Sequence, residues 1–484
     1  MILVTGATGY IGGRLIPRLV AAGRPVRALA RDPRRVSAAL RALHGPHGAR
    51  VDVVAGDVLH PETLPAALAG VEVAYYLVHS MTTAAGDDFA SRDRDAARNF
   101  ATACAQTGVR RIIYLGGLGD PAEDLSAHLT SRQETGSVLR AGPVPVTELR
   151  AAIIVGAGSA SFEIIRDLAA KLPVMVCPRW VRSRCEPIGI SQVLDYLVAV
   201  LDEPRTIGET FEIGGGEVLT YEAMMRQCAA ALGRRIRIVT VPVLTPGLSA
   251  YWLNLVTSVP MSLARPLVEG LRHDVVTRDH RIRALIPVET LTYDDMVRRA
   301  LAEEQAGPLP SRWTTAVTAP PEVPAPPGAT ELRDERVVAV AASPERLFAT
   351  VARVGGGTGW YFADRLWRLR GLIDRLFGGI GMRRGRPHPS AVAVGDPIDF
   401  WRVEDVVPGA LLRLRAEMRL PGEARLEFAI APATTGAVLV QRARFRPRGL
   451  FGRLYWYGLW PAHMAIFGGM ARGIARAAEG TAVA

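Results

Sequence analysis

The chain has 484 residues, of which 49% are hydrophobic, 22% charged and 6% aromatic. This length exceeds what one compact core holds, and the composition excludes a mainly disordered or fibrous protein. The formal net charge is +11, but Lys171 is the only lysine and alanine is abundant, as is typical of a GC-rich coding sequence, so we expect no nucleic-acid partner.

Short β-rich segments alternate with helical segments over the first 305 residues. The predicted strands cover residues 2–6, 26–30, 51–57, 71–78, 110–117 and 145–156, and predicted helices fall at 15–22, 92–107 and 190–202. Such alternation predicts a parallel sheet covered on both faces. We therefore predict an α/β, Rossmann-like, doubly wound domain over residues 1–305, whose later part forms a substrate-side lobe.

A glycine-rich turn joins the first predicted strand to the first predicted helix. It has GxxGxxG spacing and contains Gly6, Thr8, Gly9, Tyr10, Ile11 and Gly12. Glycine lets the backbone approach a pyrophosphate, and the N-terminus of the following helix offers N–H groups and the positive end of a dipole. Between a strand and a helix, this motif predicts a dinucleotide site.

The ends of the second and third strands bear on the choice of dinucleotide. Arg31 lies where an arginine accommodates the 2′-phosphate of NADP, whereas the adjacent Asp32 favours the ribose hydroxyls of NAD. We favour NADP(H) over NAD(H). Asp57 and Val58 close the third strand, where a carboxylate can accept a hydrogen bond from the adenine amino group.

Residues 1–300 resemble the atypical, extended short-chain dehydrogenase/reductase superfamily and, within it, the NmrA-like NAD(P)-binding proteins. The resemblance rests on GATGYIGG at 6–13, ALARDP at 28–33, YYLVHSM at 75–81, DRDAARNF at 93–100, RRIIYLGGLG at 110–119 and ETFEIGG at 209–215. It implies cofactor contacts by Leu77, Val78 and His79 after the fourth strand, and by Ile154 after the sixth.

The catalytic pattern of that superfamily is altered. Its reductases place a serine at the end of the fifth strand and a YxxxK pair on the next helix, whereas this chain has glycines at the strand end and His128 and Arg132 at the YxxxK spacing. Histidine can act as a general acid near neutral pH, and arginine can hold ribose. His128 and Arg132 are therefore candidate catalytic residues. Alternative proton donors are Tyr76, His79 and Tyr114. In the competing interpretation, His128 is an ordinary surface histidine and Arg132 an ordinary helix arginine.

A change of composition marks a second domain. Residues 306–330 hold seven prolines between 308 and 327, which predicts a semi-rigid linker. Residues 331–484 contain 23 arginines and 14 acidic residues and so hold most of the net charge. Strands are predicted near 398–406, 411–419, 424–430 and 437–446, before a long terminal helix, and the alternation in RLRAEMRL predicts one wet and one buried sheet face.

Residues 331–484 resemble DUF2867, a domain of unknown function that is similar to the Bet v 1/START helix-grip fold. The resemblance rests on GWY at 359–361, LWRLRGLIDRLFGG at 366–379, GDPIDFWRVE at 395–404 and LYWYGLWPAHMAIFGGM at 454–470. It implies an α+β domain whose curved antiparallel sheet surrounds a terminal helix and binds a hydrophobic ligand.

Cysteine spacing and hydropathy bear on the compartment. The four cysteines form no CxxC pair and no metal-binding pattern with histidine, which predicts unpaired thiols, no metal site and a reducing cytoplasm. The apolar stretches at 243–268 and 454–471 contain proline and polar residues, so neither predicts a membrane-spanning helix. A helix that lies on a membrane surface is kept as an alternative for both, and with it peripheral membrane contact.

Three functional hypotheses follow. The leading one is an NADP(H)-dependent oxidoreductase that acts on a hydrophobic small molecule held with help from the C-terminal domain. The loss of the usual serine, tyrosine and lysine favours its rival, a non-catalytic NADP(H)-responsive sensor or assembly protein. In the third, the helix-grip domain performs the chemistry, such as a cyclisation, and the nucleotide is structural.

Overall fold

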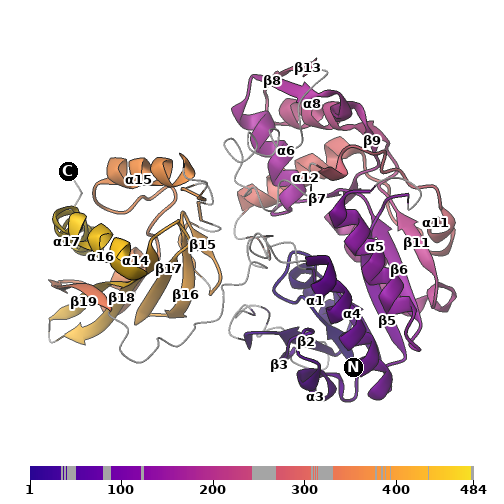
Figure 1. The fold of residues 1–484 in the computed structure, drawn as a ribbon, viewed down its shortest axis with the longest axis horizontal. Helices are drawn as coiled ribbons and strands as arrows, with labels where there is room; N and C mark the ends of the chain where they lie inside the picture. The colour runs from indigo at the N-terminus through magenta and orange to yellow at the C-terminus, as the bar shows by residue number, and fades with distance from the viewer. Residues whose placement is uncertain are drawn as a thin grey trace. The chain divides into compact units, whose positions relative to one another are not determined.

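The chain forms two compact units, Met1–Ala316 and Val317–Ala484, in a computed structural model (Figure 1). The structure describes residues 1–33, 36, 40, 51–79, 89–120, 125–241, 267, 269–306, 309, 311, 313, 331–376, 379–382, 385, 386, 389–392, 394–433 and 435–480. The predicted surface helix at 243–268 lies almost entirely outside these residues.

A seven-stranded parallel sheet organises unit 1. Its order is β11-β6-β5-β4-β1-β2-β3, with every neighbouring pair parallel. The strands are β1 (Ile2–Val4), β2 (Val26–Ala30), β3 (Asp52–Ala55), β4 (Val73–Tyr76), β5 (Arg111–Gly117), β6 (Val146–Ala151) and β11 (Thr210–Ile213). The predicted α/β, Rossmann-like fold is confirmed for this unit.

Helices cover both faces of this sheet. One face is covered by α1 (Gly12–Ala21) and α7 (Ile190–Ala199), and the other by α3 (Leu64–Leu68), α4 (Phe89–Gln106) and α5 (Ala127–Arg140). Successive strand residues join opposite layers: Leu3 and Ile112 belong to the α4 side, and Val4 and Ile113 to the α1 side. Both faces are therefore apolar, which explains the continuous hydrophobic runs of the strands.

A smaller lobe completes unit 1. Its helices are α6 (Ala160–Lys171), α8 (Tyr221–Ala231) and α12 (Tyr293–Ala306), whereas α11 (Arg281–Leu285) packs beside β11 of the main sheet. Its two-stranded sheets pair β7 (Ile154–Val155) with β10 (Ile188–Gly189), β8 (Val174–Pro178) with β13 (Arg237–Val241) and β9 (Arg184–Cys185) with β12 (Leu219–Thr220). A separate hydrophobic cluster, which includes Phe162, Met224 and Tyr293, holds the lobe together.

Part of the proline-rich segment packs on unit 1. Trp313 is buried, its backbone N–H donates to the Gly158 carbonyl at 2.9 Å, and its indole N–H donates to Glu163 Oε2 at 2.6 Å. Ser311 is also buried and donates its hydroxyl to the Tyr10 carbonyl at 2.6 Å. Unit 1 therefore extends past residue 305, because an indole and a hydroxyl from this segment satisfy polar groups on its surface.

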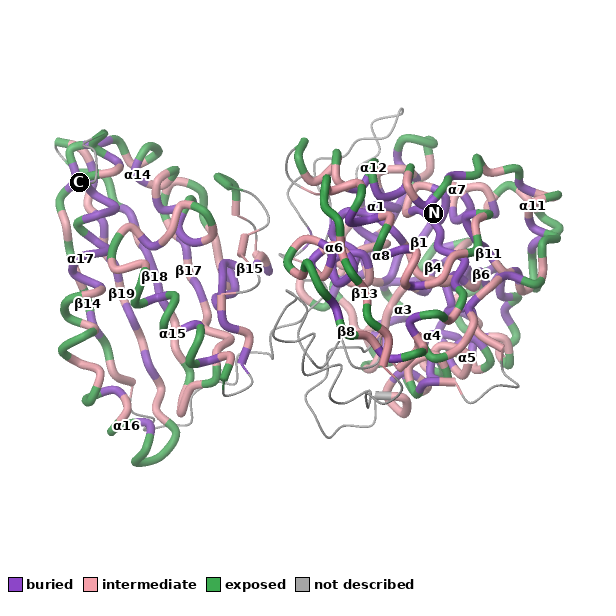
Figure 2. The backbone as a smooth tube through the Cα atoms, turned by 90° about the horizontal axis from the view of Figure 1, so that it is seen from above, coloured by how far each residue is buried: buried purple, intermediate pink, exposed green. Residues whose placement is uncertain are grey.

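Unit 2 contains a six-stranded antiparallel sheet in the order β14-β19-β18-β17-β16-β15. The strands are β14 (Leu332–Val340), β15 (Pro397–Ile398), β16 (Trp401–Val407), β17 (Leu411–Ala416), β18 (Gly422–Ala433) and β19 (Gly436–Pro447). The helices are α14 (Pro344–Val351), α15 (Asp364–Leu376), α16 (Gly449–Gly458) and α17 (Trp460–Glu479). Buried residues alternate with partly exposed ones along β17 and most of β19, as predicted, and Figure 2 colours the backbone by this burial.

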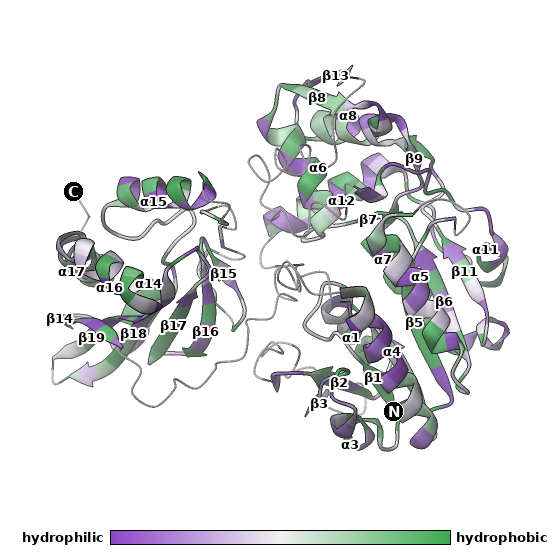
Figure 3. Cartoon of the chain, in the orientation of Figure 1, coloured by the Kyte–Doolittle hydropathy of each residue, from purple (hydrophilic) through white to green (hydrophobic). Residues whose placement is uncertain are grey.

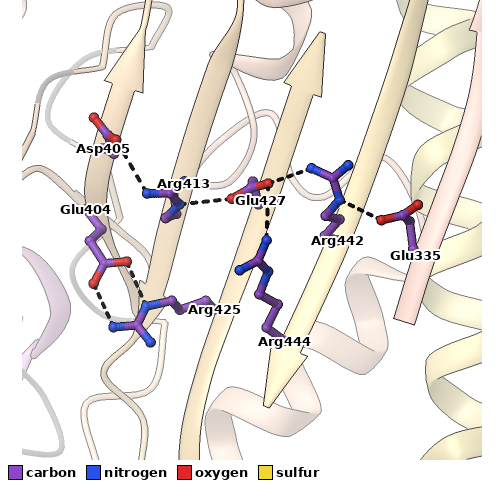
Figure 4. A network of polar contacts seen from close by, with 8 residues as sticks. All are labelled: Glu335, Glu404, Asp405, Arg413, Arg425, Glu427, Arg442 and Arg444. Carbon is purple, nitrogen blue, oxygen red and sulfur yellow. Dashed lines mark hydrogen bonds and ion pairs between the residues drawn. The ribbon is translucent and has the colours of Figure 1, made fainter. Parts of the chain in front are cut away.

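The inner face of this sheet is apolar and the outer face is ionic. Trp360, Trp367, Phe400, Trp401 and Phe467 pack ring against ring in the core. On the outer face, five charged residues of five strands stand in register with alternating sign (Figure 4): Glu335, Arg442, Glu427, Arg413 and Asp405. Arg413 and Arg442 of this row are thus paired with carboxylates on the neighbouring strands.

Candidate functional site

The glycine-rich turn connects β1 to α1 and has the form that a dinucleotide requires. Gly9 N–H donates to the Gly6 carbonyl at 2.8 Å, which closes the turn. The backbone N–H groups of Ile11 and Gly12, at the start of α1, have no backbone acceptor in the described part of the chain. Free amides at a helix N-terminus fit a pyrophosphate. The residues present therefore fit NAD(P)H.

Close backbone packing explains the glycines of this turn. Gly6 has φ +65°, and a Cβ there would lie 2.6 Å from the Leu77 carbonyl oxygen. A Cβ at Gly12 would overlap the Gly6 carbonyl oxygen. Gly13 is equally constrained, because a Cβ there would lie 2.9 Å from Ser311 Cβ. Side chains at these positions would push the turn apart.

The residues predicted to hold the adenosine half lie at the ends of β2 and β3. Arg31 directly follows β2 and is exposed. Asp57 Oδ1 accepts from Leu59 N–H at 3.0 Å, so this carboxylate shapes its own turn. Val58 is buried in the core, and its carbonyl accepts from Asn99. Arg31 is therefore the accessible charge at this edge, and Val58 supports the loop.

The residues predicted to meet the nicotinamide half surround the end of β4. Leu77 N–H donates to Thr5 Oγ1 at 2.9 Å, and Thr5 is itself bonded to the Tyr75 carbonyl, so this strand end is tied to the glycine turn. Val78 and His79 follow directly. Ile154 begins β7, and its carbonyl accepts from Ser159.

Two histidines and an aspartate form a chain of contacts beside this strand end. His79 Nδ1 lies 3.1 Å from Asp93 Oδ2, and His79 Nε2 lies 3.1 Å from His128 Nδ1. Asp93, on α4, is buried, and it also accepts from Ser131 on α5. His128 lies in the first turn of α5, which Ser126 caps. The tertiary fold thus brings together three segments that are far apart in sequence.

This chain of contacts constrains the protons. An ionised Asp93 only accepts, so it fixes a proton on His79 Nδ1. Neutral His79 then accepts from His128 Nδ1–H, which leaves a lone pair on His128 Nε2. That nitrogen has no partner among the described residues. A proton added to the pair becomes available at His128 Nε2.

The surroundings keep this histidine pair neutral near pH 7. Burial lowers the pKa of His79, although the hydrogen bond to Asp93 opposes this shift. Burial, followed by the positive charges of His79 and Arg132, holds the pKa of His128 well below its usual value. The pair therefore accepts a proton readily at neutral pH only if bound substrate raises its pKa, and it becomes a proton donor as the pH falls.

The two candidate tyrosines do not reach this position. Tyr76 and Tyr114 are each 1% exposed and belong to the core under α4 and α5. Burial raises the pKa of both phenols, and Tyr114 donates its hydroxyl to the Arg132 carbonyl at 2.8 Å. The packing of β4 and β5 places both side chains in the core, which disfavours the prediction that either tyrosine is the proton donor.

Arg132 is held close to the end of β5. Its Nη2 donates to the Leu115 carbonyl at 2.6 Å, and its guanidinium lies 5.9 Å from the centre of the Tyr114 ring. These contacts hold the guanidinium beside the end of β5.

Sequence reasoning missed three residues of this site. Asp93 and Ser131 were not singled out, although Asp93 begins the DRDAARNF segment that supports the family resemblance. Ser311 was assigned to the linker. Among the described residues, no cluster of three or more His, Cys, Asp or Glu could hold a metal ion.

Comparisons with known proteins agree with this geometry. Residues 6–151 match the NAD(P)H-binding family model, and residues 327–470 match the model for DUF2867, a protein of unknown function. The chain is 31% identical over 244 residues to (4-alkanoyl-5-oxo-2,5-dihydrofuran-3-yl)methyl phosphate reductase of Streptomyces griseus, which covers 49% of this chain and 76% of that enzyme. It is 27% identical to the ceramide reductase of Caulobacter vibrioides, over 51% of this chain and 76% of that enzyme.

Solved structures agree on the fold. The Bordetella bronchiseptica enzyme WbmG, in complex with NAD and UDP, matches 66% of this chain and 99% of its own with a TM-score of 0.50 at 17% identity. A nucleoside-diphosphate-sugar epimerase from Staphylococcus aureus matches 61% of this chain and 99% of its own, also with a TM-score of 0.50 at 17% identity.

The parallel sheet, the glycine-rich turn and the similarity to known reductases together define unit 1 as an NAD(P)H-binding, Rossmann-fold reductase domain. The chain belongs to the NAD(P)H-binding reductase family that includes the Streptomyces griseus enzyme, and it carries a DUF2867 domain after the reductase domain.

Proposed function

We propose that this protein uses NADPH to reduce the carbonyl group of a hydrophobic small molecule. The observation that carries the proposal is the contact chain Asp93–His79–His128, which ends in His128 at the position where the superfamily has its tyrosine. The glycine turn would hold the pyrophosphate, and Arg31 would meet the 2′-phosphate.

The reaction that we propose needs one hydride and one proton. NADPH supplies the hydride when it is bound. The carbonyl carbon receives this hydride, and the carbonyl electron pair moves to oxygen, which takes a proton from His128 Nε2 to give an alcohol. His79 orients His128 for this transfer, because Asp93 holds His79 Nδ1 and His79 Nε2 lies 3.1 Å from His128 Nδ1. Solvent then restores the proton to the pair.

The relatives support a substrate with an acyl chain. The two curated relatives are named for ceramide and for an alkanoyl-substituted furan, which are both acyl-chain compounds. We propose that unit 2, as a helix-grip-like domain, helps to hold such a molecule. Its aromatic inner face and apolar terminal helix support this assignment.

Turnover with a panel of long-chain ketones, enones and quinones tests the proposal. NADPH oxidation should be seen with at least one apolar carbonyl compound, together with the alcohol product in mass spectrometry. Tight NADPH binding without turnover on the whole panel would contradict the reductase proposal and favour the sensor hypothesis.

A further inference from the structure

Many of the exposed apolar side chains of unit 2 belong to two helices. Leu366, Leu369, Leu372, Ile373 and Leu376 of α15 are 39–66% exposed. Leu450, Phe451, Leu454 and Tyr457 of α16 are 62–73% exposed. We call these nine residues the apolar patch. Soluble proteins rarely expose so many large apolar side chains without a partner.

Helix α15 mixes hydrophobic and hydrophilic residues (Figure 3), and its leucines and Ile373 are exposed. Its inner side holds Trp367, Gly371 and Asp374, which are buried. A Cβ at Gly371 would lie 2.7 Å from the Met382 side chain, so the glycine allows the helix to pack closely. Since the inner contacts are complete, the outer leucines are not needed to attach the helix.

Helix α16 carries the second group of exposed apolar side chains. Its inner side holds Gly452 and Trp456, and the Trp456 ring stacks on Phe445 of β19 at 5.6 Å. Arg370 of α15 donates to the Tyr455 hydroxyl of α16 at 3.3 Å, so a side-chain contact links the two helices. As on α15, the exposed leucines of α16 are not needed to attach the helix.

The exposed charge beside the patch is positive. The two helices contain five arginines and two aspartates. Both aspartates turn inward: Asp364 accepts from Trp360 N–H, and Asp374 accepts from the backbone of Gly381 and Arg419. Arg365 and Arg368, by contrast, are exposed. A partner for this surface must therefore be apolar and must carry negative charge.

We propose that the apolar patch binds the surface of an anionic lipid bilayer. An outward apolar stripe, aromatic residues and flanking arginines are the features of interfacial helices. A second copy of this chain fits less well, because face-to-face association would oppose the arginines. No helix of the described residues is long and apolar enough to cross a membrane. This inference does not depend on the reductase activity.

Vesicle flotation of the full chain tests this proposal. Vesicles of 70% phosphatidylcholine and 30% phosphatidylglycerol should bind the protein, and binding should weaken in pure phosphatidylcholine or at high salt. The double variant Leu372→Ser/Leu454→Ser should bind at least tenfold more weakly, because two apolar anchors are lost. Arg365→Gln should reduce binding to the anionic vesicles about fivefold.

Val337→Ser is the matched control. Val337 is 63% exposed on β14, outside both helices, so its loss should leave vesicle binding unchanged. Near-ultraviolet circular dichroism of the tryptophans should show that every variant retains a folded unit 2. Absence of binding by the wild type, or equal binding by the double leucine variant, would overturn the proposal. So would a dimer or a complex with another protein that the leucine variant dissociates.

Discussion

The indole of Trp313 gives the most specific prediction about how the segment between the units is held. Trp313 is 7% exposed, and its N–H donates to the buried carboxylate of Glu163 at 2.6 Å. Trp313→Phe keeps most of the ring contacts but removes this charge-assisted hydrogen bond, which costs about 1.5–3 kcal/mol. Trp313→Ala also removes the buried ring and should cost about 3–5 kcal/mol.

Differential scanning calorimetry of the full chain measures these losses. A domain of this size shifts its Tm by about 2 °C per kcal/mol, so Trp313→Phe should lower the Tm of unit 1 by about 3–6 °C and Trp313→Ala by about 6–10 °C. The transition of unit 1 is the one that NADPH raises. Trp180→Phe is the control, because the Trp180 indole nitrogen has no hydrogen-bond partner in the described part of the chain. If Trp313→Ala lowers the Tm no more than Trp180→Phe does, the segment is not anchored as described.

Three further variants test separate parts of the structure. Gly12→Ala should abolish NADPH binding in calorimetry, because its Cβ would overlap the Gly6 carbonyl oxygen. Gly70→Ala is the control: no atom lies within 4 Å of a Cβ there, but the left-handed backbone would be strained, so this variant should lower stability without affecting NADPH binding. Arg31→Ala should lower NADPH affinity by about 1–3 kcal/mol and spare NADH affinity; equal losses for both nucleotides would refute the assignment. Glu427→Gln should destabilise unit 2 by about 1–2 kcal/mol at pH 7, because Arg413 and Arg442, which are each about one-third exposed, lose the carboxylate that they share.

The pH dependence of the Glu427 effect has a defined sign. The arginines hold the pKa of Glu427 below its usual value, against the opposing effect of burial. Its contribution to stability is therefore present above the pKa of an unfolded glutamate and is lost as the pH falls through the lower folded value. In urea titrations, the difference between wild type and Glu427→Gln should shrink below about pH 4. A difference that is constant down to pH 2 would contradict this account.

Local sequence signals predicted the fold of both units better than they predicted the arrangement of the candidate catalytic residues. The glycine turn, the strand periodicity and the alternation in RLRAEMRL each reflect backbone and packing rules that act over a few residues, and they placed both sheets. The contact between His79 and His128 joins residues 49 positions apart, and Asp93 completes it from a third segment. No spacing rule encodes such a contact, because it depends on how α4 and α5 pack on the sheet.

The other differences between the sequence predictions and the structure depend on which side chains are buried. Tyr76 and Tyr114 have the right chemistry and sit near the right strand ends, but strand alternation turns them into the core. Ser311 and Trp313 lie in a segment whose proline content predicts an extended linker, and composition does not reveal that individual side chains of such a segment fit a neighbouring surface.

The proton donor is the central claim, and the pH profile of NADPH-dependent carbonyl reduction by wild type, His128→Ala and Asp93→Asn tests it most directly. Because burial lowers the pKa of both histidines, the wild-type rate should rise as the pH falls below about 6.5. His128→Ala should lose about 10²–10⁴ in rate and the rise with it, and Asp93→Asn should shift the profile while NADPH still binds. If His128→Ala keeps both the rate and the pH profile of the wild type, the histidine pair is not the proton donor.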